Sequence, residues 1–183
     1  MSAEQFKHIV CAVRGKPESR NTAFRAIDLA LEHSARLTFC LVIEAEFLAK
    51  ATPTLTSLSP VYRQLEGMSD FSMLILCDRA ERRGVKEVNY LIRRGNIPVQ
   101  IRQLVSDLRP DALVLGRPIR GIRGSVFTPE EFNIFIEDLE KDFNIQVLEV
   151  LHESGFEENK GMSESNSLSQ PGTSDEDRDQ HAD

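Results

Sequence analysis

The residues best suited to chemistry lie in one loop, in which glycines alternate with arginines. This loop contains Gly116, Arg117, Arg120, Gly121, Arg123, Gly124 and Ser125. Glycine lets backbone N–H groups approach an anion closely, and arginine adds positive charge. The apolar run 112–115, typical of a buried strand, precedes the loop, and Thr128-Pro-Glu-Glu131 follows it as a helix start. A strand, a basic glycine loop and a helix N-terminus in succession predict a site for phosphate or another anion.

Two interpretations of this loop stay open. Gly116, Gly121, Gly124 and Ser125 either cradle a phosphate or form a strand-to-helix turn that needs glycine dihedrals and binds nothing. Its arginines either neutralise an anion or are solvated loop charges. Pro118 removes one backbone donor in both cases.

Neither catalytic nor metal-binding residues are expected. The sequence has no Gly-x-Ser-x-Gly elbow and no Gly-Lys-Ser/Thr phosphate loop. Cys11, Cys40 and Cys77 lie in apolar stretches, and the four histidines are scattered, which favours core cysteines in a reducing compartment. We expect Ser125 to act as a phosphate ligand or helix-entry residue, not as a nucleophile.

Charge divides the chain of 183 residues into two parts. Residues 153–183 hold nine acidic and two basic residues, which accounts for the whole formal net charge of −7. This segment is poor in apolar side chains, so we expect a disordered, acidic, serine-rich tail after a single domain at 1–152. The domain's balanced charge argues against nucleic acid as a partner. The N-terminus resembles no signal peptide and no apolar run approaches ~18 residues, so we expect a cytoplasmic protein without membrane insertion.

The elements around the loop alternate between strands and amphipathic helices. Strands are expected at 6–13, 36–43, 88–92, 112–115 and 145–151, and helices from 18–19, at about 60–83, at 97–108 and at 129–143. Such alternation predicts an α/β fold, a five-stranded parallel sheet with helices on both faces. Alternation in 88–92 suggests an edge strand. In the helix at 60–83, the expected core-facing residues are Val61, Leu65, Met68 and Ile75.

Ligands of such sheets bind outside the carboxyl ends of the strands, where the strand order reverses. If the reversal lies between the first and fourth strands, residues 13–15 face the loop 116–125 across a crevice. The segment 44–59 leaves the second strand at the same end of the sheet. It is either a lid over the crevice or a plain surface loop.

Several motifs in this order resemble the universal stress protein family over roughly residues 6–151. They are Ala12-Val13-x-Gly15-x-Pro17-Glu18-Ser19, Arg94-Gly95-Asn96-Ile97-Pro98, Asp111-Ala-Leu-Val-Leu-Gly116, and a terminal Val-Leu-Glu-Val strand. The resemblance implies a stress-response role and a homodimer whose last strands pair antiparallel. The interface would then include Ile145, Val147, Glu149 and Leu151.

Many members of that family bind ATP, and the resemblance implies a nucleotide site that adds Ala12, Val13, Arg14 and Val42 to the loop. Binding members usually have an aspartate where this chain has Arg14, and a guanidinium offers donors only. The glycine spacing of the loop also departs from the binding pattern. No cofactor is therefore certain, and ATP is the candidate.

Two hypotheses for function follow. In the first, which we prefer, a regulatory or stress-associated homodimer has weakened or lost ATP binding and acts through contacts with unidentified proteins. In the second, the chain is an adenine-nucleotide-binding switch that uses the glycine-arginine loop. A third class, an adenine-nucleotide hydrolase, has no catalytic constellation in its support.

Overall fold

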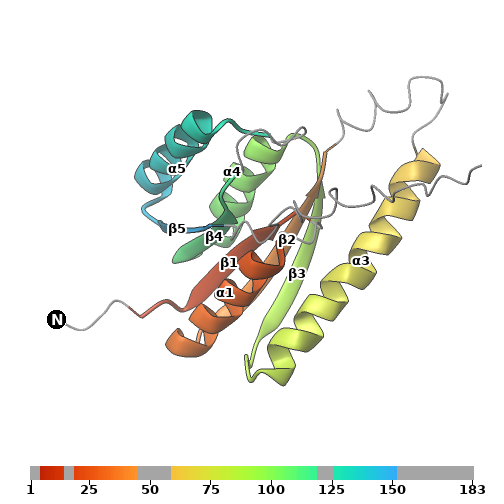
Figure 1. Cartoon of the computed structure of the whole chain (residues 1–183), viewed down its shortest axis with the longest axis horizontal. Helices are drawn as coiled ribbons and strands as arrows, with labels where there is room; N and C mark the ends of the chain where they lie inside the picture. The colour runs from red at the N-terminus through yellow and green to blue at the C-terminus, as the bar shows by residue number, and fades with distance from the viewer. Residues whose placement is uncertain (1–4, 15–18, 45–58, 119–125, 152–183) are drawn as a thin grey trace, which may run out of the picture. The chain divides into compact units, whose positions relative to one another are not determined.

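The computed structural model describes residues 5–14, 19–44, 59–118 and 126–151 (Figure 1). The chain divides into two units, and the first, Met1–His152, holds every described residue. The expected acidic tail lies outside the described residues. None of the described helices has the length and apolar character needed to cross a membrane.

Strands and helices alternate in the described ranges, as the sequence predicts. The elements are β1 (His8–Val13), α1 (Ser19–His33), β2 (Arg36–Ile43), α3 (Ser59–Arg82), β3 (Val88–Arg94), α4 (Ile97–Leu108), β4 (Ala112–Gly116), α5 (Pro129–Phe143) and β5 (Gln146–Val150). The last strand is one residue shorter at each end than expected, and β3 runs two residues further.

All five strands are parallel, in the order β3-β2-β1-β4-β5. The strand order therefore reverses between β1 and β4, the position at which a crevice was expected to place residues 13–15 opposite the loop 116–125. β1 is central: Cys11 lies opposite Phe39 of β2 on one side and Val114 of β4 on the other. The edge position expected for β3 is confirmed, and β5 forms the other edge.

Helices cover both faces of the sheet (Figure 1). α1 and α3 pack on one face through a cluster that includes Ala26 and Met73. α4 and α5 pack on the other face, where Leu104 and Leu139 are completely buried. Each such side chain contributes about 1.5–3 kcal/mol by leaving water. The α/β fold with a sheet covered on both faces is therefore confirmed.

Local sequence signals set the ends of α4 and α5. The Asn96 side chain accepts a hydrogen bond from the Val99 N–H and caps α4, with Pro98 in its first turn. α4 ends at Arg109, in the left-handed conformation with φ 43°, and α5 ends in the same way at Asn144 with φ 51°. These caps determine where the two helices beside the crevice begin and end.

The expected buried face of α3 is wrong at Met68 and Ile75, whereas the side chain of Val61 lies outside the described part of the structure. The helix buries Met73, Cys77 and Ala80, whereas Met68 is 64% and Ile75 43% exposed. The buried residues follow i, i+4, i+7, a second stripe that the apolar pattern also contains. Of the expected core-facing residues, Leu65 packs partly against the core. Since apolar residues occur on several sides of α3, periodicity alone did not select the side that meets the sheet.

Candidate functional site

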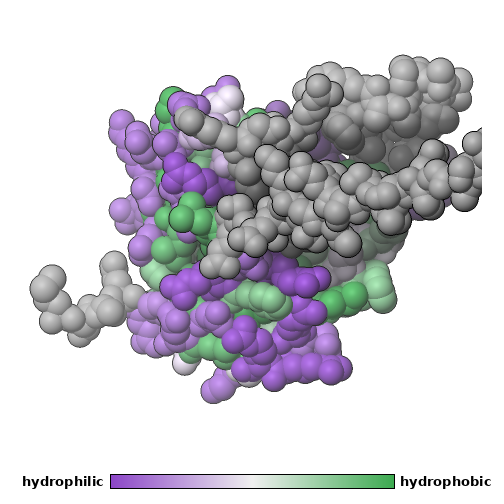
Figure 2. Space-filling view, viewed as in Figure 1, coloured by the Kyte–Doolittle hydropathy of each residue, from purple (hydrophilic) through white to green (hydrophobic). Residues whose placement is uncertain are grey.

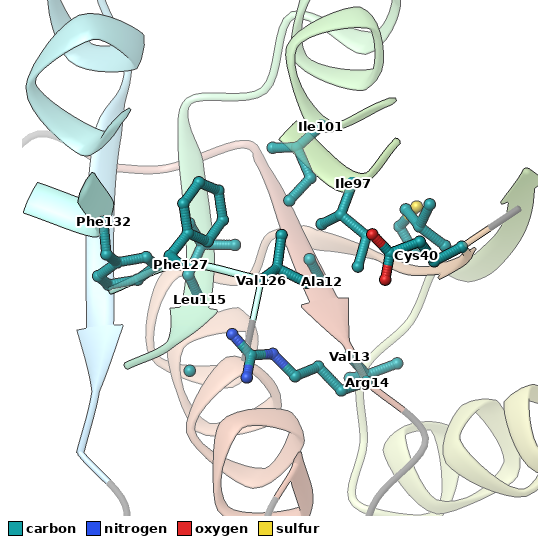
Figure 3. A pocket seen from close by; sticks show the side chains of 13 residues that line it. Ala12, Val13, Arg14, Cys40, Ile97, Ile101, Leu115, Val126, Phe127 and Phe132 are labelled. Atoms are coloured by element: carbon teal, nitrogen blue, oxygen red, sulfur yellow. The ribbon is translucent and has the colours of Figure 1, made fainter. Parts of the chain in front are cut away.

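A cavity of about 310 Å³ lies at the carboxyl ends of β1 and β4, where the strand order reverses (Figure 3). This is the position that such sheets use for ligands. Of the six proposed residues that the structure describes, five line it, namely Ala12, Val13, Arg14, Val42 and Gly116. The topology brings them together from three different strands.

Apolar side chains form most of the described wall. Ile97 and Ile101 of α4 lie on one side, and Phe127 and Phe132 lie on the other (Figure 3). Phe127, directly before the N-cap of α5, contacts the Phe132 ring with centroids 5.8 Å apart. This contact is a hydrophobic staple, in which the residue before the cap packs on the fourth helical residue. Sequence reasoning missed these wall residues, although an aromatic before Thr128 was the available signal.

Two charged residues, Arg14 and Glu44, stand among the described lining residues. Arg14 follows β1, and its backbone N–H donates to the Ser19 hydroxyl at the start of α1, at 3.0 Å. Its exposed side chain extends from the strand end beside the apolar wall (Figure 3). A guanidinium donates hydrogen bonds and accepts none, so Glu44 is the charged acceptor among the described lining residues.

The cavity offers no group suited to covalent chemistry among its described residues. Cys40 lines the wall, but burial raises the pKa of its thiol to about 11. The thiol therefore stays protonated near neutral pH and is a poor nucleophile. Across the described part of the chain, no three His, Cys, Asp or Glu side chains cluster as metal ligands.

The N-terminus of α5 is occupied by its own side chains. The Thr128 hydroxyl accepts from the Glu131 N–H at 3.2 Å, and the Glu131 carboxylate accepts from the Thr128 N–H at 2.9 Å. Glu130 and Glu131 place two acidic residues in the first turn. A carboxylate already stands where the helix dipole would favour an anion.

Arg117 lies outside the cavity lining. Its guanidinium contacts the Glu149 carboxylate at 3.0 Å and the Asn133 side-chain oxygen at 3.3 Å. Its backbone N–H also donates to the Val150 carbonyl at 2.9 Å. Arg117 thus ties the end of β4 to β5 and α5. The remaining loop candidates, Gly121, Arg123, Gly124 and Ser125, lie outside the described residues.

The four residues proposed for a dimer interface lie at or beside β5, an edge strand whose one neighbour among the described strands is β4. Ile145 is buried and Val147 half-buried, whereas Glu149 is exposed and Leu151 is 67% exposed. Gln146 donates its N–H to the Asp111 carbonyl, on the β4 side. By alternation, the N–H groups of Val147 and Glu149 point toward the open edge.

A family model and several solved structures of known proteins resemble this chain in sequence or fold. A model of the universal stress protein family matches residues 5–128. Universal stress protein UspA from Lactobacillus plantarum is 15% identical with TM-score 0.62, over 81% of this chain and 99% of that one. A universal stress protein family structure from Burkholderia pseudomallei is 14% identical with TM-score 0.57, over 81% and 98%. A universal stress protein solved with cAMP is 15% identical with TM-score 0.54, over 81% and 99%. No curated protein sequence matches the chain.

Proposed function

The chain belongs to the universal stress protein family, and from that premise we propose a cytoplasmic, stress-associated regulatory homodimer that acts through protein contacts. In this proposal the crevice has lost most of its affinity for ATP, and the protein catalyses no reaction. The capping of α5 is the observation that carries the proposal.

A phosphate chain at this end of the sheet needs backbone N–H donors and a positive helix terminus. At α5, the Thr128 hydroxyl already bonds the Glu131 N–H, and the Glu131 carboxylate bonds the Thr128 N–H. A phosphate would have to displace a carboxylate and then lie beside Glu130. Like charges at this distance repel, so the helix terminus disfavours the γ- and β-phosphates of ATP.

The base and ribose end of a nucleotide meets a second obstacle. Arg14 stands at the end of β1, where a carboxylate would accept bonds from an adenine amine or ribose hydroxyls. The apolar wall of Ile97, Ile101 and Phe127 offers contact area but no side-chain acceptor, which leaves Glu44 as the charged acceptor among the described lining residues. Both ends of the crevice therefore support weakened nucleotide binding.

The proposed dimer uses the open edge of β5. Exposed strand edges pair readily with another strand, and an identical edge gives a two-fold symmetric contact. Val147 to lysine places a charge in the middle of this edge and should give a monomer on sizing. Gln146 to lysine is the matched control, because Gln146 precedes Val147 on the opposite face of β5. An unchanged oligomer in the Val147 variant argues against this interface.

A second candidate function is an adenine-nucleotide switch. The observation in its favour is the cavity of about 310 Å³ at the strand-order reversal. A structure of the same fold, reported in complex with cAMP, suggests the nucleotides to test. In this alternative the loop 119–125, which lies outside the described residues, would supply the phosphate contacts that α5 does not.

Calorimetric titration of the full chain with ATP, AMP and cAMP separates the two functions. We expect no saturable heat from the unmodified chain and a gain of binding in Arg14→Asp. A restored bond to a charged acceptor is worth about 1.5–3 kcal/mol, or roughly 10- to 150-fold. Arg20→Asp, exposed on α1 and outside the cavity lining, controls for net charge. Micromolar ATP binding by the unmodified chain would establish the switch instead.

A further inference from the structure

α3 carries an apolar surface that no described part of the protein covers. We call it the α3 stripe: Gly67, Met68, Phe71, Leu74 and Ile75. Phe71 is 68%, Met68 64%, Leu74 54% and Ile75 43% exposed. Figure 2 shows hydrophobic colour over the middle of α3, next to hydrophilic residues at its C-terminal end.

Contacts between the opposite side of α3 and the sheet orient the stripe away from the sheet. Glu66 pairs with Arg94 of β3, and Asp70 accepts from the Tyr90 hydroxyl at 3.2 Å. Glu66, Asp70 and the buried Met73 lie on one side of the helix, at i, i+4 and i+7. Positions 67, 68, 71, 74 and 75 therefore face away from the sheet.

The stripe is large enough to mark an interface. A large apolar side chain has about 150–250 Å² of surface, so these exposed fractions amount to roughly 400 Å² per protomer. A contiguous apolar patch of this size matches the largest patch on a typical soluble monomer, and such a patch is often functional. Two such patches together give roughly 800 Å², so the polar residues on the flanks of the stripe must add area before the contact reaches the ~1,200 Å² of a specific interface.

We propose that the α3 stripe pairs with the α3 stripe of a second copy of this chain, as an antiparallel helix pair with its two-fold axis at Phe71. The stripe is close to symmetric about this residue. Met68 and Leu74 lie three positions before and after it, and Gly67 and Ile75 lie four positions before and after. A two-fold contact requires this kind of self-complementarity.

Side-chain size and charge match across the proposed pair. Antiparallel pairing sets Gly67 of one copy against Ile75 of the other. Nothing lies within 4 Å of where a Cβ would stand on Gly67, so its surface is open to the incoming isoleucine. The same pairing brings the exposed Arg63 near Glu81 of the second copy, on one flank of the stripe, whereas Asp78 on that flank already pairs with Arg82 of its own helix.

This contact is separate from the proposed β5 contact. α3 packs on β3 and β2, at one edge of the sheet, and β5 forms the opposite edge. A chain that uses both two-fold contacts assembles beyond the dimer, into a closed ring or an open row. The α3 pairing does not depend on the crevice or on nucleotide.

Disulfide trapping tests the geometry directly. Met68 of one copy should lie opposite Leu74 of the other, so a mixture of Met68→Cys and Leu74→Cys chains should form a covalent dimer on mild oxidation. Six residues along a helix span about 9 Å, too far for either variant alone, because a disulfide needs Cα atoms about 4.4–6.8 Å apart. The unmodified chain is the control, since Cys11, Cys40 and Cys77 are buried. Covalent dimers from each single variant would overturn the antiparallel arrangement.

Sedimentation with Phe71→Glu tests the energetics. In Phe71→Glu we expect the dissociation constant of the α3 contact to be at least tenfold higher than in the unmodified chain. Ser72 is exposed beside the stripe, so Ser72→Glu should leave this dissociation constant unchanged. Running both in a Val147→Lys background separates the α3 contact from the β5 contact. Unchanged association in Phe71→Glu, together with no trapped dimer, overturns the proposal. A loss of stability without a change in association would show that the same chain covers the stripe.

Discussion

The Glu140 carboxylate of α5 accepts a hydrogen bond at 3.0 Å from the backbone N–H of Val147 in β5. This N–H points to the open edge of the sheet, so a charged side chain occupies one of the donors that a second strand would use. Charged residues at an edge commonly restrain strand addition. Pairing of two β5 strands therefore requires Glu140 to move away.

Removing this carboxylate should strengthen strand pairing. In Glu140→Ala, each copy offers the Val147 N–H without breaking a hydrogen bond of about 1 kcal/mol. We expect a dimer about 5- to 30-fold tighter, measured by sedimentation in the full chain. Glu137→Ala, exposed on the same helix, is the control. Equal affinities in the two variants would contradict a β5 interface that uses this donor.

Phe132 should matter to stability far more than its neighbour Ile134. Phe132 is 2% exposed and forms part of the cavity wall, whereas Ile134 is 60% exposed. Phe132→Ala leaves a void and should lower the free energy of unfolding by about 3–5 kcal/mol. Ile134→Ala should change it by less than ~0.5 kcal/mol. Urea unfolding curves measure both, and similar losses would mean that the site is packed differently.

The buried His8 should make stability depend on pH. Its Nε2 lies 2.9 Å from the Thr38 hydroxyl oxygen, and its Nδ1 lies 3.0 Å from an Arg36 guanidinium nitrogen. Since Arg36 can only donate, Nδ1 accepts and Nε2–H donates, which requires the neutral ring. Burial, and then the charge of Arg36, lower the pKa of His8 below 6.5.

The direction of this pH dependence follows because His8 binds a proton more readily in the unfolded chain than in the folded one. The contribution of neutral His8 is fully present above about pH 6.5 and is lost as the pH falls below it. Urea unfolding at pH 7.5 and pH 5.0 should show a loss that is smaller in His8→Gln. Parallel pH dependence in both proteins would assign the titration to another group.

The cysteines should resist thiol reagents in the folded protein. Burial raises the pKa of Cys40 and of Cys77 to about 11, and raises that of Cys11 as well. The thiolate is the reactive form, so labelling at pH 7.5 should be slow until urea unfolds the chain. Rapid labelling of one cysteine in the native protein, located by mass spectrometry, would indicate local opening around that residue.

Much of this fold was predictable because local chemistry and the global fold agree. Thr128 and Pro129 start α5, and Pro110 follows the end of α4, so the predicted bounds 97–108 and 129–143 match the structure. The order of the five strands in the sheet could not be predicted, because no single segment of the sequence determines it. Only the pairing of β1 with both β2 and β4 shows where the crevice lies.

The site was predictable in part, for reasons visible in its residues. Arg14 and Gly116 follow strand ends, and a strand end is a position that sequence patterns reveal. Phe127 and Ile101 reach the cavity through tertiary packing, which periodicity does not report. Arg117 sits in a basic loop like an anion ligand, yet its partner Glu149 is 32 positions away. The side of α3 that meets the sheet was likewise decided by tertiary contacts with β3.

The central place of β1 has a consequence for how the chain folds during synthesis. The Asp111 carboxylate accepts hydrogen bonds from the Lys7 and His8 N–H groups, a link across 103 positions from His8. β1 therefore gains its second neighbour only after most of the domain has left the ribosome. Until then one side of the innermost strand stays open, and contacts of such high sequence separation form slowly. A nascent chain halted before β4 should bind chaperones that recognise exposed strands, and release should coincide with the arrival of Asp111.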